Sequence, residues 1–300
     1  MTAFRFAVAT TPSAKPDDAV DFAVRAERSG FEAFAMADLP AALGVLPMLA
    51  AVARATSKIR LLPFVLNTAA WLPSVAARDL ATLDRLSGGR VEVGLGSGIP
   101  HPGIEEPLRS QPGARYERLK ATVGALEAAW SDPEFTPGFV QERPRLTIAV
   151  TGERALRLAA RRADTFVIAS VPPVPQVQLP RGEQILPELA ATERQLERLR
   201  EAAGDRAAQL EIGTGAPVVV TDDPRGWAEE KAKLHTYLTP DDILASPKVL
   251  VGTVEQVADR ILDYGERLGL THYVFTRSQT PEELVPIVDL VRRKSGQAVA

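Results

Sequence analysis

The fold of this chain is decided by residues 59–100, IRLLPFVLNTAAWLPSVAARDLATLDRLSGGRVEVGLGSGIP. This stretch predicts a buried strand from Ile59 to Leu66, an amphipathic helix from about Pro73 to Leu86, and a second buried strand from Arg90 to Leu95. Gly88, just after the helix, is the residue type that most readily takes the left-handed conformation at a helix end. Two apolar strands joined by a helix indicate a βαβ unit in a parallel sheet that is covered by helices.

The same alternation extends over the whole chain, without a linker between strands and helices. Eight strands are predicted, and the six outside the first unit lie at residues 4–10, 31–37, 146–150, 164–170, 210–221 and 271–275. We expect Gly213 and Gly215 to break the strand at 210–221. Three hundred residues suit an eight-stranded α/β barrel, which needs about 250 residues plus insertions. We therefore predict a single domain over residues 1–300, a (β/α)8 TIM barrel with insertions at the carboxyl ends of the strands.

Two proline-rich segments follow predicted strands. Residues 99–111 contain three prolines and show no periodicity, so we expect a long loop there. Residues 171–181 contain four prolines and exclude a helix, and we expect an extended segment across the mouth of the site. Long loops in compact domains are more often functional than idle. Helices are predicted after the second loop, at residues 183–203, and as an insertion at residues 222–238.

Composition excludes several classes of function. The chain has no cysteine, which excludes disulfides, a thiol nucleophile and a thiolate metal site, and three histidines make a multi-histidine metal centre improbable. The net charge of −3 gives no argument for binding nucleic acid or an anionic membrane. No stretch reaches the roughly 20 apolar residues of a membrane span, and no signal peptide is evident. We expect a cytoplasmic enzyme that acts on a small molecule and holds no metal.

Several candidate site residues come after predicted strands, where parallel α/β folds carry their sites. Asp38 follows a buried strand, and we favour a catalytic role for it over a cap of the next turn. His101 lies in the long loop and is a candidate proton donor or ligand contact, although exposed loop histidines are nearly as common. Trp71 follows a strand and is a candidate for stacking on a ligand, whereas Trp130 ends a helix and is assigned to the core.

Glycines mark two further places. The run Gly94-Leu-Gly96-Ser-Gly98 invites a dinucleotide-binding interpretation, but Ile99 and Pro100 follow and open no helix, which argues against it. These glycines either let the strand end turn sharply or let a flat ring lie near the backbone. Residues 151–153, Thr-Gly-Glu, form a strand–helix junction that offers free amides to a phosphate, or simply a well-capped helix start.

Charged residues near the predicted strand starts receive no chemical role. Arg5, Arg60 and Arg90 lie at the end of the barrel that carries stability, and His272 is interpreted in the same way. The residues together indicate a barrel whose mouth is largely apolar and poor in histidine. Such a mouth suits hydride chemistry supplied by an organic cofactor better than it suits hydrolysis.

The run LATLDRLSGGR at residues 80–90, followed by VGLGSG at 93–98, resembles the luciferase-like monooxygenase superfamily. The segment LASPKVLVGT at 244–253, with Gln256 and Val257 beyond it, is similar to an actinobacterial branch that depends on the deazaflavin coenzyme F420. The resemblance covers nearly the whole chain in order, from Phe4 to about Val291. Neither segment decides which cofactor is used.

The resemblance implies a barrel with the tricyclic ring of the cofactor across the carboxyl ends of the strands. In deazaflavin-dependent relatives a non-proline cis peptide backs the ring, which by position is Phe64-Val65 here. The acidic residue of the second strand matches Asp38. The residues implied to bind the cofactor are Phe64, Val65, Leu66, Asn67, Gly96, Gly98, Thr151, Gly152, Glu153 and Ser170, and those expected to contact the substrate are Trp71 and Ile99.

The chain departs from its relatives at four places. Leu39 stands where some relatives have a histidine, and Ile99 where others have a glutamate. The phosphate turn keeps only one glycine, Gly152, and Glu153 is expected to repel a phosphate. A lysine found soon after the sixth strand is missing, since Ser170 is followed by Val-Pro-Pro. Hydride transfer remains possible because the cofactor supplies it.

Three hypotheses follow. The first is an oxidoreductase in which reduced F420 delivers hydride to a small enone or imine. The second is a monooxygenase that depends on flavin mononucleotide (FMN). The third, of another class, is a barrel that has lost the redox cofactor and acts as a non-redox enzyme or a ligand-binding protein. The substrate and the direction of the reaction stay open, and a homodimer is expected only because many relatives are dimers.

Overall fold

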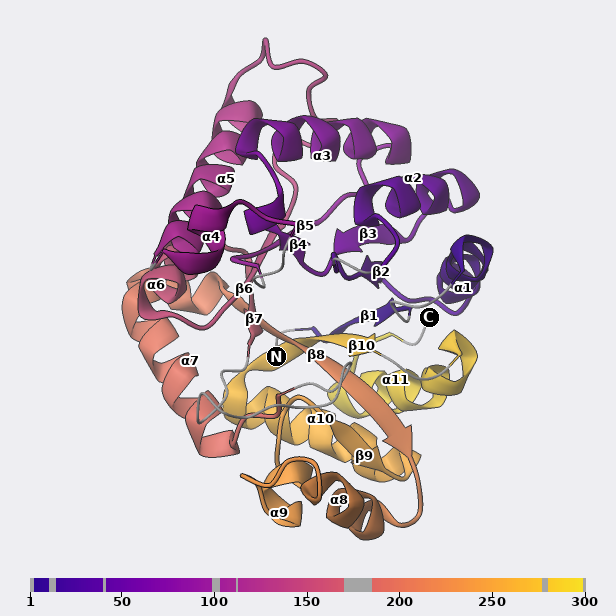
Figure 1. Cartoon of the computed structure of the whole chain (residues 1–300). Coiled ribbons are helices and arrows are strands. Elements are labelled where there is room, and N and C mark those ends of the chain that lie inside the picture. Colours follow the sequence, from indigo (N-terminus) through magenta and orange to yellow (C-terminus); the bar gives the residue numbers. More distant parts are fainter. Residues whose placement is uncertain are drawn as a thin grey trace.

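The centre of the molecule is a ring of parallel strands surrounded by helices (Figure 1). The computed structural model describes residues 3–10, 15–39, 42–98, 103–111, 113–169, 185–276 and 280–298. Its strands are β1 (Arg5–Ala9), β2 (Ala33–Met36), β3 (Arg60–Pro63), β4 (Leu66–Asn67), β5 (Val93–Gly96), β6 (Leu146–Val150), β7 (Thr165–Ile168), β8 (Glu211–Val220), β9 (Leu250–Gly252) and β10 (Leu270–Thr276).

The helices follow the strands and pack on the outside of the ring (Figure 1). They are α1 (Pro16–Arg28), α2 (Val45–Ala55), α3 (Pro73–Ser87), α4 (Glu106–Ser110), α5 (Ala114–Ser131), α6 (Glu153–Arg162), α7 (Leu189–Ala203), α8 (Pro224–Ala232), α9 (Pro240–Leu244), α10 (Val254–Leu268) and α11 (Pro281–Ser295), with short 3-10 turns at Thr68–Ala70 and Gly204–Gln209. Gly88 ends α3 in the left-handed conformation, with φ 68° and ψ 40°, as predicted. No helix in the described part of the chain is both long enough and apolar enough to cross a membrane.

The ring closes into the predicted barrel. The strand order is β3-β2-β1-β10-β8-β7-β6-β5-β4, and β9 pairs with the outer end of β8. β3 and β4 are two parts of one barrel strand, because β4 pairs with β5 while Leu61 of β3 bridges Val91 just before β5. The described chain therefore fills eight strand positions, and the (β/α)8 prediction is confirmed.

Side chains alternate between the two faces of the barrel wall, as the period of a strand requires. Phe6, Phe34 and Phe166 belong to the large core between the strands and the helices. Their neighbours on the other face are small: Ala7, Ala33, Ala35, Leu62 and Val274 form a separate cluster inside the barrel, against which Ala9 and Phe64 pack. Each fully buried large side chain of the outer core contributes about 1.5–3 kcal/mol to folding.

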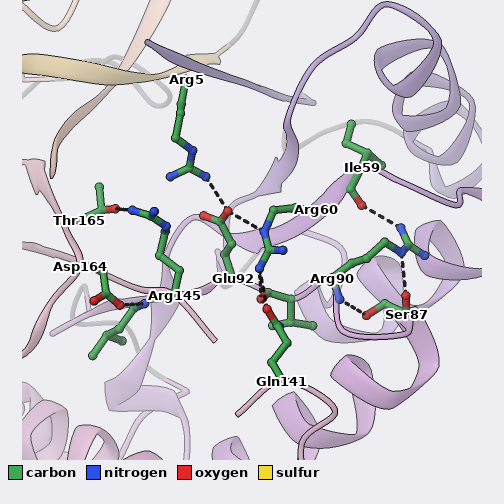
Figure 2. A network of polar contacts seen from close by, with 12 residues as sticks. Arg5, Ile59, Arg60, Ser87, Arg90, Glu92, Gln141, Arg145, Asp164 and Thr165 are labelled. Carbon is green, nitrogen blue, oxygen red and sulfur yellow. Dashed lines mark hydrogen bonds and ion pairs between the residues drawn. The ribbon is translucent and has the colours of Figure 1, made fainter. Parts of the chain in front are cut away.

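The amino-terminal end of the barrel is closed by buried charges (Figure 2). Glu92, only 1% exposed, accepts hydrogen bonds from Arg5 Nη2 at 2.5 Å and from Arg60 Nε at 2.8 Å. Glu211 accepts from Arg5 Nη1 at 2.9 Å and from Thr165 Oγ1 at 2.7 Å. These contacts lie at the amino-terminal ends of the strands, where the sequence analysis predicted a structural role for Arg5 and Arg60. They give the arginines a structural role there.

Five segments differ from the sequence-based expectations. The segment expected to be a loop at 99–111 contains the short helix α4, which is held by Leu108 and Ile104 on Ala69. Strand β8 runs unbroken for ten residues, because its two glycines face the barrel interior and sit close to neighbouring side chains. Helix α7 begins at Leu189, α8 ends at Ala232, and strand β9 was not predicted. The segment at 171–181 lies outside the described residues.

Candidate functional site

The predicted site residues gather at one end of the barrel. Asp38 lies just beyond β2, Phe64 just beyond β3, Gly98 just beyond β5 and Thr151 just beyond β6. All these strands are parallel, so their carboxyl ends open on the same side. The partly exposed residues that mark this mouth are Ala9, Asp38, Phe64, Val65, Ser97, Gly98, Ala149, Ala169 and Thr276.

One wall of the mouth is formed by residues 63–67. The peptide bond between Phe64 and Val65 is cis, at the position that the family resemblance indicated. Leu66 is fully buried behind this wall, whereas Phe64 and Val65 remain partly exposed towards the mouth. The wall therefore presents one aromatic and one branched apolar side chain, and Phe64 packs against the apolar cluster inside the barrel.

Glycines on β5, which adjoins the wall, and on β8, which does not, make room for this wall. A Cβ atom at Gly94 would lie 2.0 Å from the carbonyl oxygen of Pro63, and one at Gly96 would lie 2.7 Å from Val65 Cγ2. A Cβ atom at Gly215 of β8 would lie 2.8 Å from Phe64 Cε1. The glycines of the VGLGSG run thus allow close packing of the chain against itself. Any contact of Gly96 with a flat ring would be made beside Val65.

Asp38 connects the end of β2 to the segment that follows β4. Its Oδ2 accepts hydrogen bonds from the backbone N–H of Asn67 at 3.0 Å and from Trp71 Nε1 at 2.8 Å. Hydrogen bonds to a carboxylate are roughly twice as strong as those between neutral groups. The Trp71 carbonyl in turn accepts from Arg118 Nη1 at 2.9 Å. The indole of Trp71 is thereby held in one orientation beside the mouth.

Asn67 carries a buried acceptor without a donor. Its side chain is almost fully buried, and no described residue donates to Oδ1. Gly98, with φ 84°, passes so close that a Cβ atom there would lie 1.7 Å from this oxygen. An unsatisfied buried acceptor costs about 1–3 kcal/mol, and a donor from a bound molecule is one way to complete it.

The predicted phosphate turn opens on a cleft of about 470 Å³. Gly152 is the residue before the first turn of α6, and no side chain caps the free amides of this helix end. Glu153 does not act as an unpaired charge here, because Arg157 Nε donates to its carboxylate at 3.0 Å. The cleft is lined by Ser97, Arg109, Ser110, Gln111, Gly113, Arg115, Tyr116, Thr151, Gly152, Glu153, Arg154 and Ala155.

Three arginines in this cleft were missed by sequence reasoning. Arg109 lies in α4 and Arg115 in α5, whereas Arg154 follows the turn itself. Arg115 Nη1 donates to the carbonyl oxygen of Gly98 at 3.2 Å, and Arg154 lies 4.2 Å from the ring centre of Tyr116. No periodic pattern in the sequence indicates that these cations converge, because α4 and α6 lie more than forty residues apart.

A further cation, Lys248, lies near the end of β7. Its Nζ donates to the carbonyl oxygen of Ile168 at 3.2 Å, and desolvation lowers the pKa of Lys248 to about 8. Among the described residues Lys248 forms no ion pair.

Three predicted site residues, Ile99, His101 and Ser170, lie outside the described part of the chain. The residues that the structure describes contain no group of three or more acidic or histidine side chains that could hold a metal ion.

Comparison with known proteins adds three findings. The family model described as luciferase-like monooxygenase matches residues 1–180. An F420-dependent glucose-6-phosphate dehydrogenase of Beutenbergia cavernae is 28% identical over an alignment of 309 positions, gaps included, and the match covers 87% of each chain. An FMNH(2)-dependent dimethylsulfone monooxygenase of Pseudomonas putida is 31% identical over an alignment of 122 positions, gaps included, and the match covers 37% of this chain and 33% of that protein.

The fold is shared with solved structures. The coenzyme F420-dependent tetrahydromethanopterin reductase of Methanopyrus kandleri superposes with a TM-score of 0.69 over 96% of this chain and 97% of that chain. The two sequences are 17% identical, so this likeness concerns the fold alone.

Proposed function

The chain belongs to the luciferase-like monooxygenase family, and we propose that it is an oxidoreductase that uses coenzyme F420 for hydride transfer with a small organic substrate, such as an enone or an imine. The observation that supports this proposal is that an apolar wall and a cationic cleft lie next to each other at one end of the barrel. A partly apolar wall at residues 63–67 suits a flat ring, and a cationic cleft beyond Gly98 suits the anionic part of the same molecule. Full-length relatives that use F420 support it.

The residues at the mouth fit this cofactor. Phe64 and Val65 would back the ring, with Leu66 behind them. The orphan oxygen of Asn67 would accept a hydrogen bond from the ring. Gly96 and Gly98 would lie along the same path, and Ser170 remains a candidate cofactor contact. The phosphate would sit at the free amides of α6, near Thr151 and Gly152, where the pairing of Glu153 with Arg157 lessens the expected repulsion. When bound, F420 supplies the hydride.

Asp38 has a positioning role in this proposal. One of its oxygens already accepts from two N–H groups, which anchor Asn67 and Trp71 beside the mouth. A carboxylate used in this way holds the wall and the indole in place, so that a substrate lies against Trp71 in a fixed orientation. His101 remains the candidate proton donor, and Ile99 the second substrate contact.

Lys248, near the end of β7, is a candidate to donate a hydrogen bond to the oxygen or nitrogen of the substrate. Its ammonium has one backbone acceptor, Ile168, and two further N–H groups to donate. Delivery of hydride to an enone or imine places negative charge on the heteroatom. An ammonium with a pKa of about 8 can stabilise that charge or give up a proton near neutral pH.

An FMN-dependent monooxygenase is the second candidate, because the Pseudomonas putida relative uses reduced FMN and the cleft would also take a phosphate monoester. We also propose that residues 1–300 act as one catalytic domain, because β1 and β10, from the two ends of the chain, pair with each other to close the barrel.

A fluorescence titration of the purified protein with oxidised F420, and in parallel with FMN, tests the proposal. Saturable micromolar binding of F420 is expected. Binding of FMN alone would favour the monooxygenase. Binding of neither would overturn both redox candidates and leave a barrel that has given up its cofactor.

A further inference from the structure

We propose that the cleft beside α6 recognises carboxylate groups beyond the cofactor's phosphate, and so selects a deazaflavin with a glutamate tail over FMN, whose chain ends at its phosphate. This inference rests on the proposed function, because it concerns the same bound molecule. It adds a distinct claim: the protein reads the anionic tail as well as the ring.

The cleft extends well past the phosphate turn. One side is formed by residues 151–155 at the start of α6, and the other by residues of α4 and α5, from Arg109 to Tyr116. Ser97 lies in the same cleft and immediately precedes Gly98 at the barrel mouth. A molecule that leaves the mouth past Ser97 and reaches the α6 amides therefore has further space, lined by α4 and α5, in front of it.

The charges in the cleft exceed what one phosphate needs. Its acidic residue, Glu153, is paired with Arg157, and Arg154 is paired with Glu117 at 2.6 Å. Arg109 and Arg115 form no ion pair within the described residues. Arg115 donates only to the Gly98 carbonyl, which places it next to the phosphate position. Arg109, which lies on α4, is then available to bind a second anion.

The backbone that carries Arg109 is held in place, although the Arg109 side chain itself is exposed. Its helix α4 is anchored by Ile104 and Leu108, which pack on Ala69 beside the barrel mouth. Arg118 pairs with Glu105 just before the helix at 3.3 Å. A guanidinium presents a planar fork that matches a carboxylate, and the helix fixes where along the cleft this fork starts. What separates Arg109 from a solvated surface arginine such as Arg28, at the end of α1 on the opposite side of the barrel (Figure 1), is that Arg109 lines the cleft.

The test compares three probes by titration: F420 with its glutamate tail, the same coenzyme with the glutamates removed, and FMN. Wild-type protein is expected to bind the tailed form most tightly. Arg109→Gln should weaken the tailed form by about three- to fivefold, the range of one exposed ion pair, and leave the tail-less form unchanged. Arg109→Glu should weaken the tailed form by about tenfold. Arg28→Gln is the matched control and should change neither affinity.

The outcomes separate the two proposals. If tailed and tail-less coenzyme bind equally, and Arg109→Glu changes neither, the tail site is overturned while F420 dependence stands. If FMN binds as tightly as tailed F420, selection by the cleft is likewise overturned. If no form of F420 binds to the wild type, the proposed function itself fails. Raising the salt concentration should reduce the preference for the tailed form, since exposed charges are screened over about 10 Å at 0.1 M salt.

Discussion

Replacing Gly152 with aspartate should weaken cofactor binding without harming the fold. The position imposes no constraint that only glycine meets, because its φ of −74° and ψ of 147° are open to any residue. No heavy atom lies within 4 Å of a Cβ atom built there. Gly152 precedes a helix that has no side-chain cap, so aspartate would accept from the free amides. We expect a gain of a few tenths of a kcal/mol from the cap and about 0.5 kcal/mol from the helix dipole.

The same charge opposes a phosphate at this turn. Two unit charges about 5 Å apart in a medium of effective dielectric about 40 repel by about 1.7 kcal/mol. This corresponds to about a 15-fold increase in Kd. The variant is therefore expected to be as stable as the wild type, or slightly more stable, and to bind the cofactor about 15 times more weakly. Opposite signs for stability and binding distinguish this mechanism from general damage.

Gly152→Asn is the matched control, because asparagine has the shape and the capping ability of aspartate without its charge. Both variants and the wild type would be titrated with F420 by fluorescence and unfolded with urea. Gly152→Asn should keep its affinity within about threefold. Equal affinity of the aspartate variant and the wild type would refute the phosphate placement. Equal loss in both variants would mean that a side chain, and not charge, blocks the turn.

Three further predictions concern the scaffold and the wall. Trp71→Phe removes the hydrogen bond to Asp38 and should cost about 1–2 kcal/mol of unfolding free energy and loosen cofactor binding, whereas an unchanged urea midpoint would show that the bond contributes nothing. Glu92→Gln leaves Arg5 and Arg60 without their shared carboxylate and should cost about 3 kcal/mol in urea unfolding, and a loss below 1 kcal/mol would contradict the buried network. Burial, with a smaller effect of nearby Arg5, lowers the pKa of His272 from 6.5 to about 3, so the unfolded chain binds the proton first as pH falls. Stability should thus drop by about 2 kcal/mol between pH 7 and pH 5, and His272→Gln should flatten this slope in unfolding curves recorded across that range.

Local sequence patterns were enough for the architecture. The alternation of apolar strands and amphipathic helices predicted the barrel, the strand at 146–150 was placed without error, and Gly88 marked the end of α3. These features depend on residues within one turn or one strand of each other. The order of the elements also placed Asp38, residues 64–67 and the turn at 151–153 at one end of the barrel, because parallel strands all point the same way.

Only the tertiary structure decided which of these residues act on one another. Asp38 and Trp71 are 33 positions apart, and their hydrogen bond forms because β2 and the segment after β4 meet at the mouth. Gly94 and Gly96 are required by residues 63–65 of a neighbouring strand, which the spacing of the glycines does not reveal. Strand β9 forms by pairing with an extension of β8, since three residues carry too short a pattern to be recognised alone.

The charge balance of the cleft also depends on three-dimensional packing. The pairing of Glu153 with Arg157, four residues later on the same helix, is local and could have been expected from the sequence, whereas the approach of Arg109 could not. Arg109 reaches the cleft because α4 rests on Ala69, through contacts between segments that show no periodicity in the sequence. Hydrophobic periodicity reports which side of an element is buried. The partners that a polar side chain finds on other elements are set only when the barrel closes and brings distant segments together.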